Sequence, residues 1–173
     1  MRFHSATTRV LAAASLVAAA FLLTGCGFQL RGVANLPYET MYVDLPPNSP
    51  IGAEIKRTLR AGTKTRIVED RSEAEAVLIP VREARTKIIL SLSSSGRVRE
   101  FRLRYAFEFR VADRQGRDLI APVTLVIERD FPFNDSQVLA KETEEALQYR
   151  DMQSDMVQQV LRRIEASERL KPG

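Results

Sequence analysis

Residues 101–111 read FRLRYAFEFRV, and this stretch decides which kind of fold the chain can adopt. Apolar side chains occupy alternate positions, and charged side chains occupy most of the positions between them. Successive side chains of a β-strand point to opposite faces, so the pattern predicts a long strand with one buried and one wet face. We expect the aromatic side chains to be core rather than lipid-facing, because neighbouring elements offer them partners. The aromatic stripe comprises Phe101, Tyr105, Phe107 and Phe109, and the charged positions are Arg102, Arg104, Glu108 and Arg110.

A turn is expected on each side of this strand. Before it, Ser95-Gly96 predicts a two-residue turn, which would pair Ile88 with Leu103. After it, Arg114-Gln115-Gly116 predicts a three-residue loop with glycine at the position of positive φ. That loop would pair Tyr105 with Leu125 and Phe107 with Val123, so that apolar residues face each other. The sequence therefore predicts an antiparallel meander of three long strands over Val77–Phe131.

The first strand of this meander carries two irregular features. Its apolar residues change from odd to even positions along the strand, which predicts a bulge or break near Glu83–Arg85. Pro80 cannot donate a ladder hydrogen bond, so it predicts that this part of the strand is an edge.

Two helices and two short strands complete the expected set of elements. Strands are predicted at Met41–Leu45 and Arg66–Glu69. Between them, Ser49 and Pro50 predict the start of a helix that Gly62 ends, with Ile51, Ile55 and Leu59 on one face. Asn134 or Asp135 is expected to cap a last helix that runs to about Ser167, with a kink or a break near Tyr149–Asp151.

The N-terminus has the pattern of a signal peptide. Arg2 and Arg9 precede an uncharged apolar run, Val10–Leu23. A helix of that length spans about 21 Å, which is shorter than the roughly 30 Å hydrocarbon core, so the run fits a signal and not a membrane span. The run ends in Leu23-Thr24-Gly25-Cys26, which resembles the bacterial lipobox, where the cysteine is acylated and the signal is cut before it. We therefore expect Cys26 to be lipidated and residues 1–25 to be removed.

Composition excludes several classes of function. The chain has 173 residues, of which 45 % are hydrophobic, as in globular proteins. Loss of Arg2 and Arg9 would leave 24 Lys and Arg against 22 Asp and Glu, an excess too small for a nucleic-acid-binding protein. His4 and Cys26 are the only histidine and cysteine. A mature chain without histidine excludes His-based acid–base catalysis, Ser-His-Asp triads and His-ligated zinc, and one cysteine excludes internal disulfides. We expect no catalytic residues, no metal and no cofactor.

Two motifs and the order of elements carry a resemblance to a known family. The first motif runs Cys26-Gly27-Phe28-Gln29-Leu30-Arg31-Gly32, and the second is the Asn134-to-Ala140-Lys141 start of the last helix. With these motifs the chain resembles the LptE family of lipopolysaccharide-assembly lipoproteins. The resemblance implies an α+β fold, an α/β roll in which a mainly antiparallel four-stranded sheet carries two helices on one face. It divides the chain into a signal (1–25), a lipidated linker (26–40) and one roll domain (41–173).

The resemblance also implies a function and partners. The family is expected to plug and help assemble LptD, a large outer-membrane β-barrel protein, and to bind lipopolysaccharide for export to the cell surface. The expected partners are therefore LptD, lipopolysaccharide and the outer membrane, whose periplasmic face holds the lipid anchor because no Asp follows Cys26. The alternative is another periplasm-facing lipoprotein that acts as a lipid-binding or envelope-scaffold module.

Three cationic residues are the candidate lipopolysaccharide-binding site. Arg97 and Arg99 follow the first turn on the odd face, above the apolar stripe, and lipid A presents phosphates beside acyl chains in the same way. The alternative is that these charges only keep a strand end soluble. Lys141 matches the Ala-Lys of the family pattern, and the alternative for it is a helical pair with Glu144 or Glu145.

Overall fold

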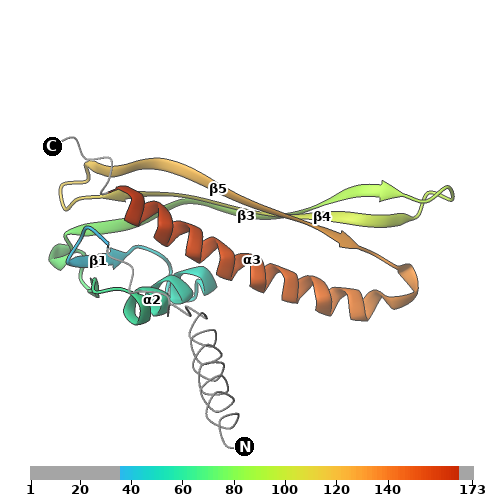
Figure 1. Cartoon of the computed structure of the whole chain (residues 1–173), viewed down its shortest axis with the longest axis horizontal. Coiled ribbons are helices and arrows are strands. Elements are labelled where there is room, and N and C mark those ends of the chain that lie inside the picture. The colour runs from blue at the N-terminus through green and yellow to red at the C-terminus, as the bar shows by residue number, and fades with distance from the viewer. Residues whose placement is uncertain (1–35, 168–173) are drawn as a thin grey trace, which may run out of the picture. The chain divides into compact units, whose positions relative to one another are not determined.

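A computed structural model describes residues 36–167. Figure 1 shows three long strands with a long helix running along one side of them. The elements in chain order are β1 (Thr40–Val43), α2 (Pro50–Gly62), β2 (Arg66–Ile67), a 3-10 turn (Arg71–Glu73), β3 (Ala76–Leu92), β4 (Val98–Ala112), β5 (Asp118–Pro132), a second 3-10 turn (Asp135–Gln137) and α3 (Val138–Ser167).

The sheet has five strands in the order β2-β1-β3-β4-β5. β3, β4 and β5 form the expected antiparallel meander, whereas β1 pairs in parallel with both β2 and β3. The α+β class is thus confirmed, and the expected four-stranded sheet is corrected to a mixed sheet of five. Parallel pairing is possible here because α2 forms the crossover between β1 and β2.

Helix α2 begins at the position that its capping residues predict. The Ser49 side chain accepts a hydrogen bond from the Gly52 amide at 3.1 Å, and Pro50 occupies the first turn. The apolar face, with Ile51, Ile55 and Leu59, is fully buried. The helix ends at Gly62, as expected, and Thr63 closes it by donating its amide to the Leu59 carbonyl.

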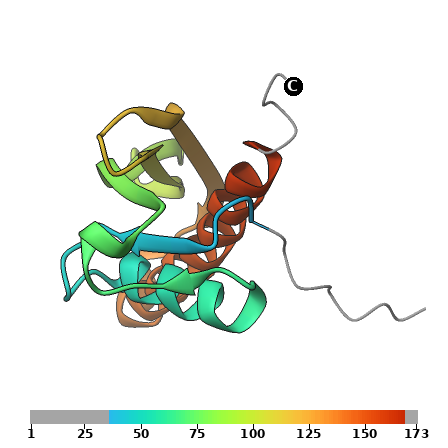
Figure 2. The same cartoon turned by 90° about the vertical axis from the view of Figure 1, so that its left-hand side faces the viewer.

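Helix α3 runs without interruption from Val138 to Ser167, so the break allowed by the sequence near Tyr149–Asp151 does not occur. Asn134 caps the 3-10 turn before it, with its side chain accepting from the Ser136 amide. All the buried side chains of α3 lie in its second half, from Met152 onward. Figure 2 shows this half beside α2, with both helices on the same side of the sheet. The first half of α3 lies below the outer part of the long strands, where it has no deeply buried apolar face.

The core lies between the two helices and one face of the sheet. The prediction that the aromatic stripe belongs to the core is confirmed. Tyr105, Phe107 and Phe109 are fully buried, and only Phe101 is half-buried. Tyr38 also belongs to the core. The linker expected over 26–40 therefore ends earlier than predicted, because Tyr38 packs against the core and Thr40 already belongs to β1. Cys26 and the signal lie outside the described residues.

The register of the first hairpin differs from the predicted one by one residue. Leu103 pairs with Lys87 rather than with Ile88, and Phe101 pairs with Ile89. The connection is a three-residue loop, in which Ser93 and Arg97 face each other and Gly96 has a φ of 79°. A slip of one residue exchanges the two faces of a strand, so Lys87 lies on the helix side of the sheet.

The second hairpin has the predicted loop and a shifted register. The Asp113 amide donates to the Arg117 carbonyl and Gly116 has a φ of 83°, as the three-residue loop requires. Two irregularities beyond the loop move the pairing by two residues, so Tyr105 faces Ile127 and Phe107 faces Leu125. A shift of two preserves the faces, and apolar residues still meet apolar residues.

Strand β3 is partly an edge, as Pro80 predicts. β1 pairs with Ala76–Leu78 only, so from Ile79 onward the one strand beside β3 within the described chain is β4. The bulge expected near Glu83–Arg85 occurs slightly earlier, between Pro80 and Arg82. Pro80 thus lies where β3 leaves its parallel neighbour, and its missing amide hydrogen costs no ladder bond on that side.

Candidate functional site

The candidate site occupies the end of the sheet that lies away from the core. There the β3–β4 hairpin projects, and the chain passes from β5 into the start of α3 at the same end (Figure 1). The Phe133 amide donates to the Arg99 carbonyl at 2.8 Å and joins these two segments. The fold therefore brings Arg97 and Arg99 to the same end as Lys141, although about forty residues separate them in the chain.

The hairpin tip is stabilised by its own serine residues. The Ser93 amide donates to the Arg97 carbonyl at 2.7 Å, and the Arg97 amide donates to the Ser93 hydroxyl at 3.1 Å. The Ser93 and Ser95 hydroxyl groups are 2.9 Å apart and share a further hydrogen bond. The backbone of Arg97 thus holds the turn, while its guanidinium takes no part in it.

The side chains of Arg97 and Arg99 are exposed. Neither forms an ion pair with a carboxylate anywhere in residues 36–167. Leu92 pairs with Val98, but the preceding residue Ser91 pairs with Glu100. Arg99 is therefore an extra, unpaired residue in β4. The alternation of faces is interrupted there, so the argument that both arginines share the face of Phe101 no longer holds. Two exposed cations outside the ion pairs of residues 36–167 nevertheless remain available for an anion.

Lys141 is engaged within the fold. Its ammonium group lies 2.8 Å from Glu144 and 5.2 Å from the centre of the Phe131 ring, and its side chain is only 15 % exposed. The pair with Glu144 is one of the two alternatives that the sequence left open for this residue. An anion that binds Lys141 must therefore compete with a carboxylate already in contact with it.

A second lysine–aromatic contact lies beside Lys141 and was missed by the sequence analysis. The Lys87 ammonium lies 4.3 Å from the centre of the Phe101 ring and pairs with Glu145 at 2.5 Å. Phe101 in turn contacts Phe133 edge to face, with ring centres 5.2 Å apart. The predicted register placed Lys87 on the opposite face, and only the observed register puts it under α3. Such cation–ring contacts are worth about 0.5–2 kcal/mol each.

A polar cluster continues this layer toward the core. The Tyr105 hydroxyl donates to Glu83 at 2.7 Å, and the Arg85 guanidinium lies 4.7 Å from the centre of the Tyr105 ring. Burial raises the pKa of the Tyr105 hydroxyl, and the hydrogen bond to Glu83 raises it further. Arg85 also donates to Gln153 of α3 at 2.8 Å. The part of α3 from Lys141 to Gln153 is thus joined to the strands by ion pairs, hydrogen bonds and cation–ring contacts.

The sheet face opposite the helices is polar, as the alternation in β4 predicts. Cross-strand ion pairs cover it, namely Arg102–Asp130, Arg104–Glu128 and Arg110–Asp118. The hydrogen bonds from Arg102 lower the pKa of the Asp130 carboxyl. A hollow of about 160 Å³ on this face is floored by small residues such as Ala84 and Ala106.

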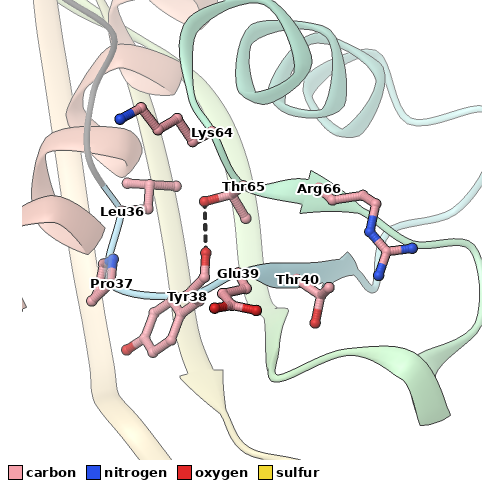
Figure 3. A pocket seen from close by; sticks show the side chains of 8 residues that line it. All are labelled: Leu36, Pro37, Tyr38, Glu39, Thr40, Lys64, Thr65 and Arg66. Atoms are coloured by element: carbon pink, nitrogen blue, oxygen red, sulfur yellow. Dashed lines mark hydrogen bonds between the residues drawn. The ribbon is translucent and has the colours of Figure 1, made fainter.

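A larger cleft of about 550 Å³ lies beside β1 and β2 (Figure 3). Some of its polar groups are paired within the fold. The Thr65 hydroxyl donates to the Tyr38 carbonyl at 2.8 Å, and the Glu39 amide donates to Glu75. Nothing in its lining converges on a common point as a catalytic or ligand site would require.

Other acidic residues have structural roles. Glu69 pairs with Lys56 and Arg60, and Asp70 accepts the Ser72 amide as a helix cap. Within residues 36–167 no group of three or more acidic, histidine or cysteine side chains is arranged to hold a metal ion. In that same part of the chain no helix is both long enough and apolar enough to cross a membrane.

The sequence is similar to proteins of one family. A family model described as LptE, lipopolysaccharide-assembly, matches residues 38–164. An LPS-assembly lipoprotein LptE from Pectobacterium atrosepticum is 27 % identical over 165 residues, which cover 93 % of this chain and 85 % of that protein. An LPS-assembly lipoprotein LptE from Yersinia pestis (strain Pestoides F) is 32 % identical over 170 residues, which cover 93 % and 76 % of the two chains.

The structure is similar to those of bacterial lipoproteins. The solution structure of uncharacterized lipoprotein B from Nitrosomonas europaea has a TM-score of 0.71 and 41 % identity, covering 81 % of this chain and 91 % of that one. The crystal structure of a minor lipoprotein from Acinetobacter baumannii has a TM-score of 0.64 and 25 % identity, covering 77 % and 95 %. Both comparisons extend over most of the described fold.

Proposed function

The chain belongs to the LptE family of lipopolysaccharide-assembly lipoproteins, and from this premise we propose that it is a non-enzymatic component of lipopolysaccharide export at the outer membrane. In this proposal Cys26 carries the lipid anchor on the periplasmic face, and the roll domain plugs the LptD barrel and helps to assemble it. The observation that carries the proposal is the extent of the family match, because residues 38–164 include nearly the whole described fold.

The surface of the domain supports the role of a plug. Barrel interiors are polar, so a plug needs a polar outer surface that does not aggregate in water. The sheet face opposite the helices carries ion pairs along β4 and β5, such as Arg102–Asp130 and Arg104–Glu128. A surface of this kind suits a polar barrel wall better than a lipid bilayer.

The hairpin tip is the better candidate for lipopolysaccharide contact. Arg97 and Arg99 are exposed and without acidic partners in the described chain, and guanidinium groups bind phosphates with two hydrogen bonds at once. Lys141 lies at the same end but is held by Glu144 over the Phe131 ring. We therefore assign lipid A phosphate first to the arginines, with Lys141 as a secondary contact that releases Glu144.

Co-purification tests the role as a plug. The full chain, with its anchor, is expressed with LptD and extracted in detergent, and the complex is isolated through a tag on the chain. We expect LptD to be recovered in a stoichiometric complex. Recovery of the chain alone, or with an inner-membrane transporter, would instead support a separate lipid-binding or scaffold module.

A further inference from the structure

Strand β3 has a long unpaired edge. Along Ala76–Leu78 it has a strand on each side, but along Ile79–Leu92 it pairs with β4 only, as far as residues 36–167 are concerned. One side-chain contact reaches this stretch of backbone from α3, where the Tyr149 hydroxyl donates to the Thr86 carbonyl at 2.9 Å. The edge otherwise presents a row of backbone donors and acceptors that is suited to pairing with a further strand.

This edge also carries much of the exposed apolar surface of the domain. Nine large apolar side chains are exposed within residues 36–167, and five of them lie on β3, with exposures between 39 and 55 %. These five are Val81, Ile88, Ile89, Leu90 and Leu92. Long, apolar, unpaired edges promote aggregation in monomeric proteins, and proteins usually protect them.

The opposite edge of the same sheet is protected. β5 contains Pro122 and Pro132, which cannot donate ladder hydrogen bonds, and the charged run Glu128–Asp130. It bears one exposed large apolar residue, Val126. β3 has only Pro80, at the point where its pairing with β1 ends. Both edges carry charged residues, but β5 has two prolines and one exposed large apolar residue, whereas β3 has one proline and five such residues.

We propose that the β3 edge from Val81 to Leu92 binds an extended segment of the barrel partner by strand addition. This inference rests on the proposed function and adds the site and the mode of contact. A lipid cannot satisfy alternating backbone donors and acceptors, whereas a polypeptide strand can. The occupant is a strand with apolar side chains opposite Ile88–Leu92 and an acidic side chain opposite Arg82, which forms no ion pair in the described chain.

Charge disfavours a second copy of this chain as the occupant. The edge carries three basic residues, Arg82, Arg85 and Lys87; Arg85 pairs with Glu83 and Lys87 with Glu145, so Arg82 is the cation outside any ion pair of the described residues. Two copies paired edge to edge would bring two such Arg82 side chains to one interface without supplying a carboxylate for either, which disfavours the pair. A partner strand of opposite charge avoids this repulsion.

Hydrogen exchange of the backbone amides tests the proposal. The full chain is measured in detergent, alone and in complex with LptD. We expect the amides of Val81–Leu92 that exchange fast in the chain alone to exchange at least tenfold more slowly in the complex. The fast amides of the protected edge, β5, serve as the internal control and should change little.

Each outcome separates the inference from the proposed function. A complex in which the β3 amides remain fast overturns strand addition but leaves the plug proposal intact. Absence of any complex overturns the plug proposal and, with it, this inference. If those amides are already slow in the chain alone, light scattering identifies the occupant: a dimer indicates a second copy and a monomer indicates the chain's own residues outside 36–167. Either result overturns the proposal.

A variant pair supplies a second test. Val81→Lys with Leu92→Lys introduces charge at both ends of the edge, at side chains that are already half exposed, so the fold should tolerate it. The matched control is Val126→Lys, on the protected edge. We expect the double variant to recover at least fivefold less LptD than the control, with similar thermal melting. Equal recovery of LptD by both variants contradicts the proposal. If the double variant does not fold, hydrogen exchange of the unmodified chain, alone and in complex, tests the proposal instead.

Discussion

Replacement of Arg97 and Arg99 by Asp is expected to weaken lipopolysaccharide binding at least tenfold. A charge-assisted hydrogen bond is worth about 1.5–3 kcal/mol, and 1.4 kcal/mol corresponds to one factor of ten in affinity. Loss of a single guanidinium–phosphate contact is therefore enough for this effect, and the added carboxylates repel phosphate as well. Rising salt should also weaken the binding of the unmodified chain, because exposed charges are screened.

The structure indicates that this double substitution leaves the fold intact. Both side chains are exposed and have no acidic partner in residues 36–167, and exposed charges contribute little to stability. The turn depends on the Arg97 backbone and the Ser93 hydroxyl, which the substitution keeps. Thermal melting should therefore stay within a few degrees of that of the unmodified chain.

The assay is a titration of labelled lipopolysaccharide, with thermal melts of every variant. Arg117→Asp is the control at the other hairpin, where Arg117 follows Gly116 as Arg97 follows Gly96 but pairs with Asp113. Unchanged affinity in the double variant, with unchanged melting, refutes the tip as the binding site and favours Lys141. An equal loss of lipopolysaccharide affinity in Arg117→Asp refutes the hairpin tip as the location of the site, since the change in net charge alone would then explain the effect.

Three further outcomes are expected. Phe109→Ala should lower the free energy of unfolding by about 3–5 kcal/mol in urea titrations, because the ring is fully buried; a loss below 1 kcal/mol would contradict its place in the core. Cys26→Ala should abolish labelling by radioactive palmitate and release the protein from outer membranes, and continued labelling would show that another residue is acylated. The Asp130 carboxyl has a lowered pKa in the fold, so its stabilising contribution is present above the unfolded value near 4 and is lost as the pH falls through the folded value. Asp130→Asn should therefore reduce the acid-induced loss of stability in melts between pH 6 and pH 2, and an unchanged profile would show that the pair with Arg102 is not coupled to folding.

Local patterns in the sequence were sufficient for the individual elements. The alternation over 101–111 predicts a strand and its buried face, because a strand directs successive side chains to opposite sides. Ser49, Pro50 and the spacing of Ile51, Ile55 and Leu59 predict α2, because caps and apolar periodicity act within a few residues. The polar face of the sheet follows from the same alternation, and the exposed tip from its serine–glycine turn.

Tertiary structure decided how these elements are paired. The hairpin registers depend on loop type and on bulges, such as those beside Leu90 and Arg99, which alternation does not reveal. β2, which the sequence predicts over Arg66–Glu69, is only two residues long, and its parallel pairing with β1 is set by the path of the chain through α2. Strand periodicity predicts which residues share a face but not which residues lie opposite each other, because pairing depends on the whole path of the chain between them.

The candidate site divides in the same way. The sequence by itself determined that Arg97 and Arg99 follow an exposed turn, and the motifs around Cys26 and Lys141 indicated the family. Only the fold determined that Lys141 is held by Glu144 and that Lys87 lies over Phe101 under α3. Charge and turn propensity are properties of neighbouring residues, whereas an ammonium group over a ring depends on segments that only the packed sheet and helix bring together.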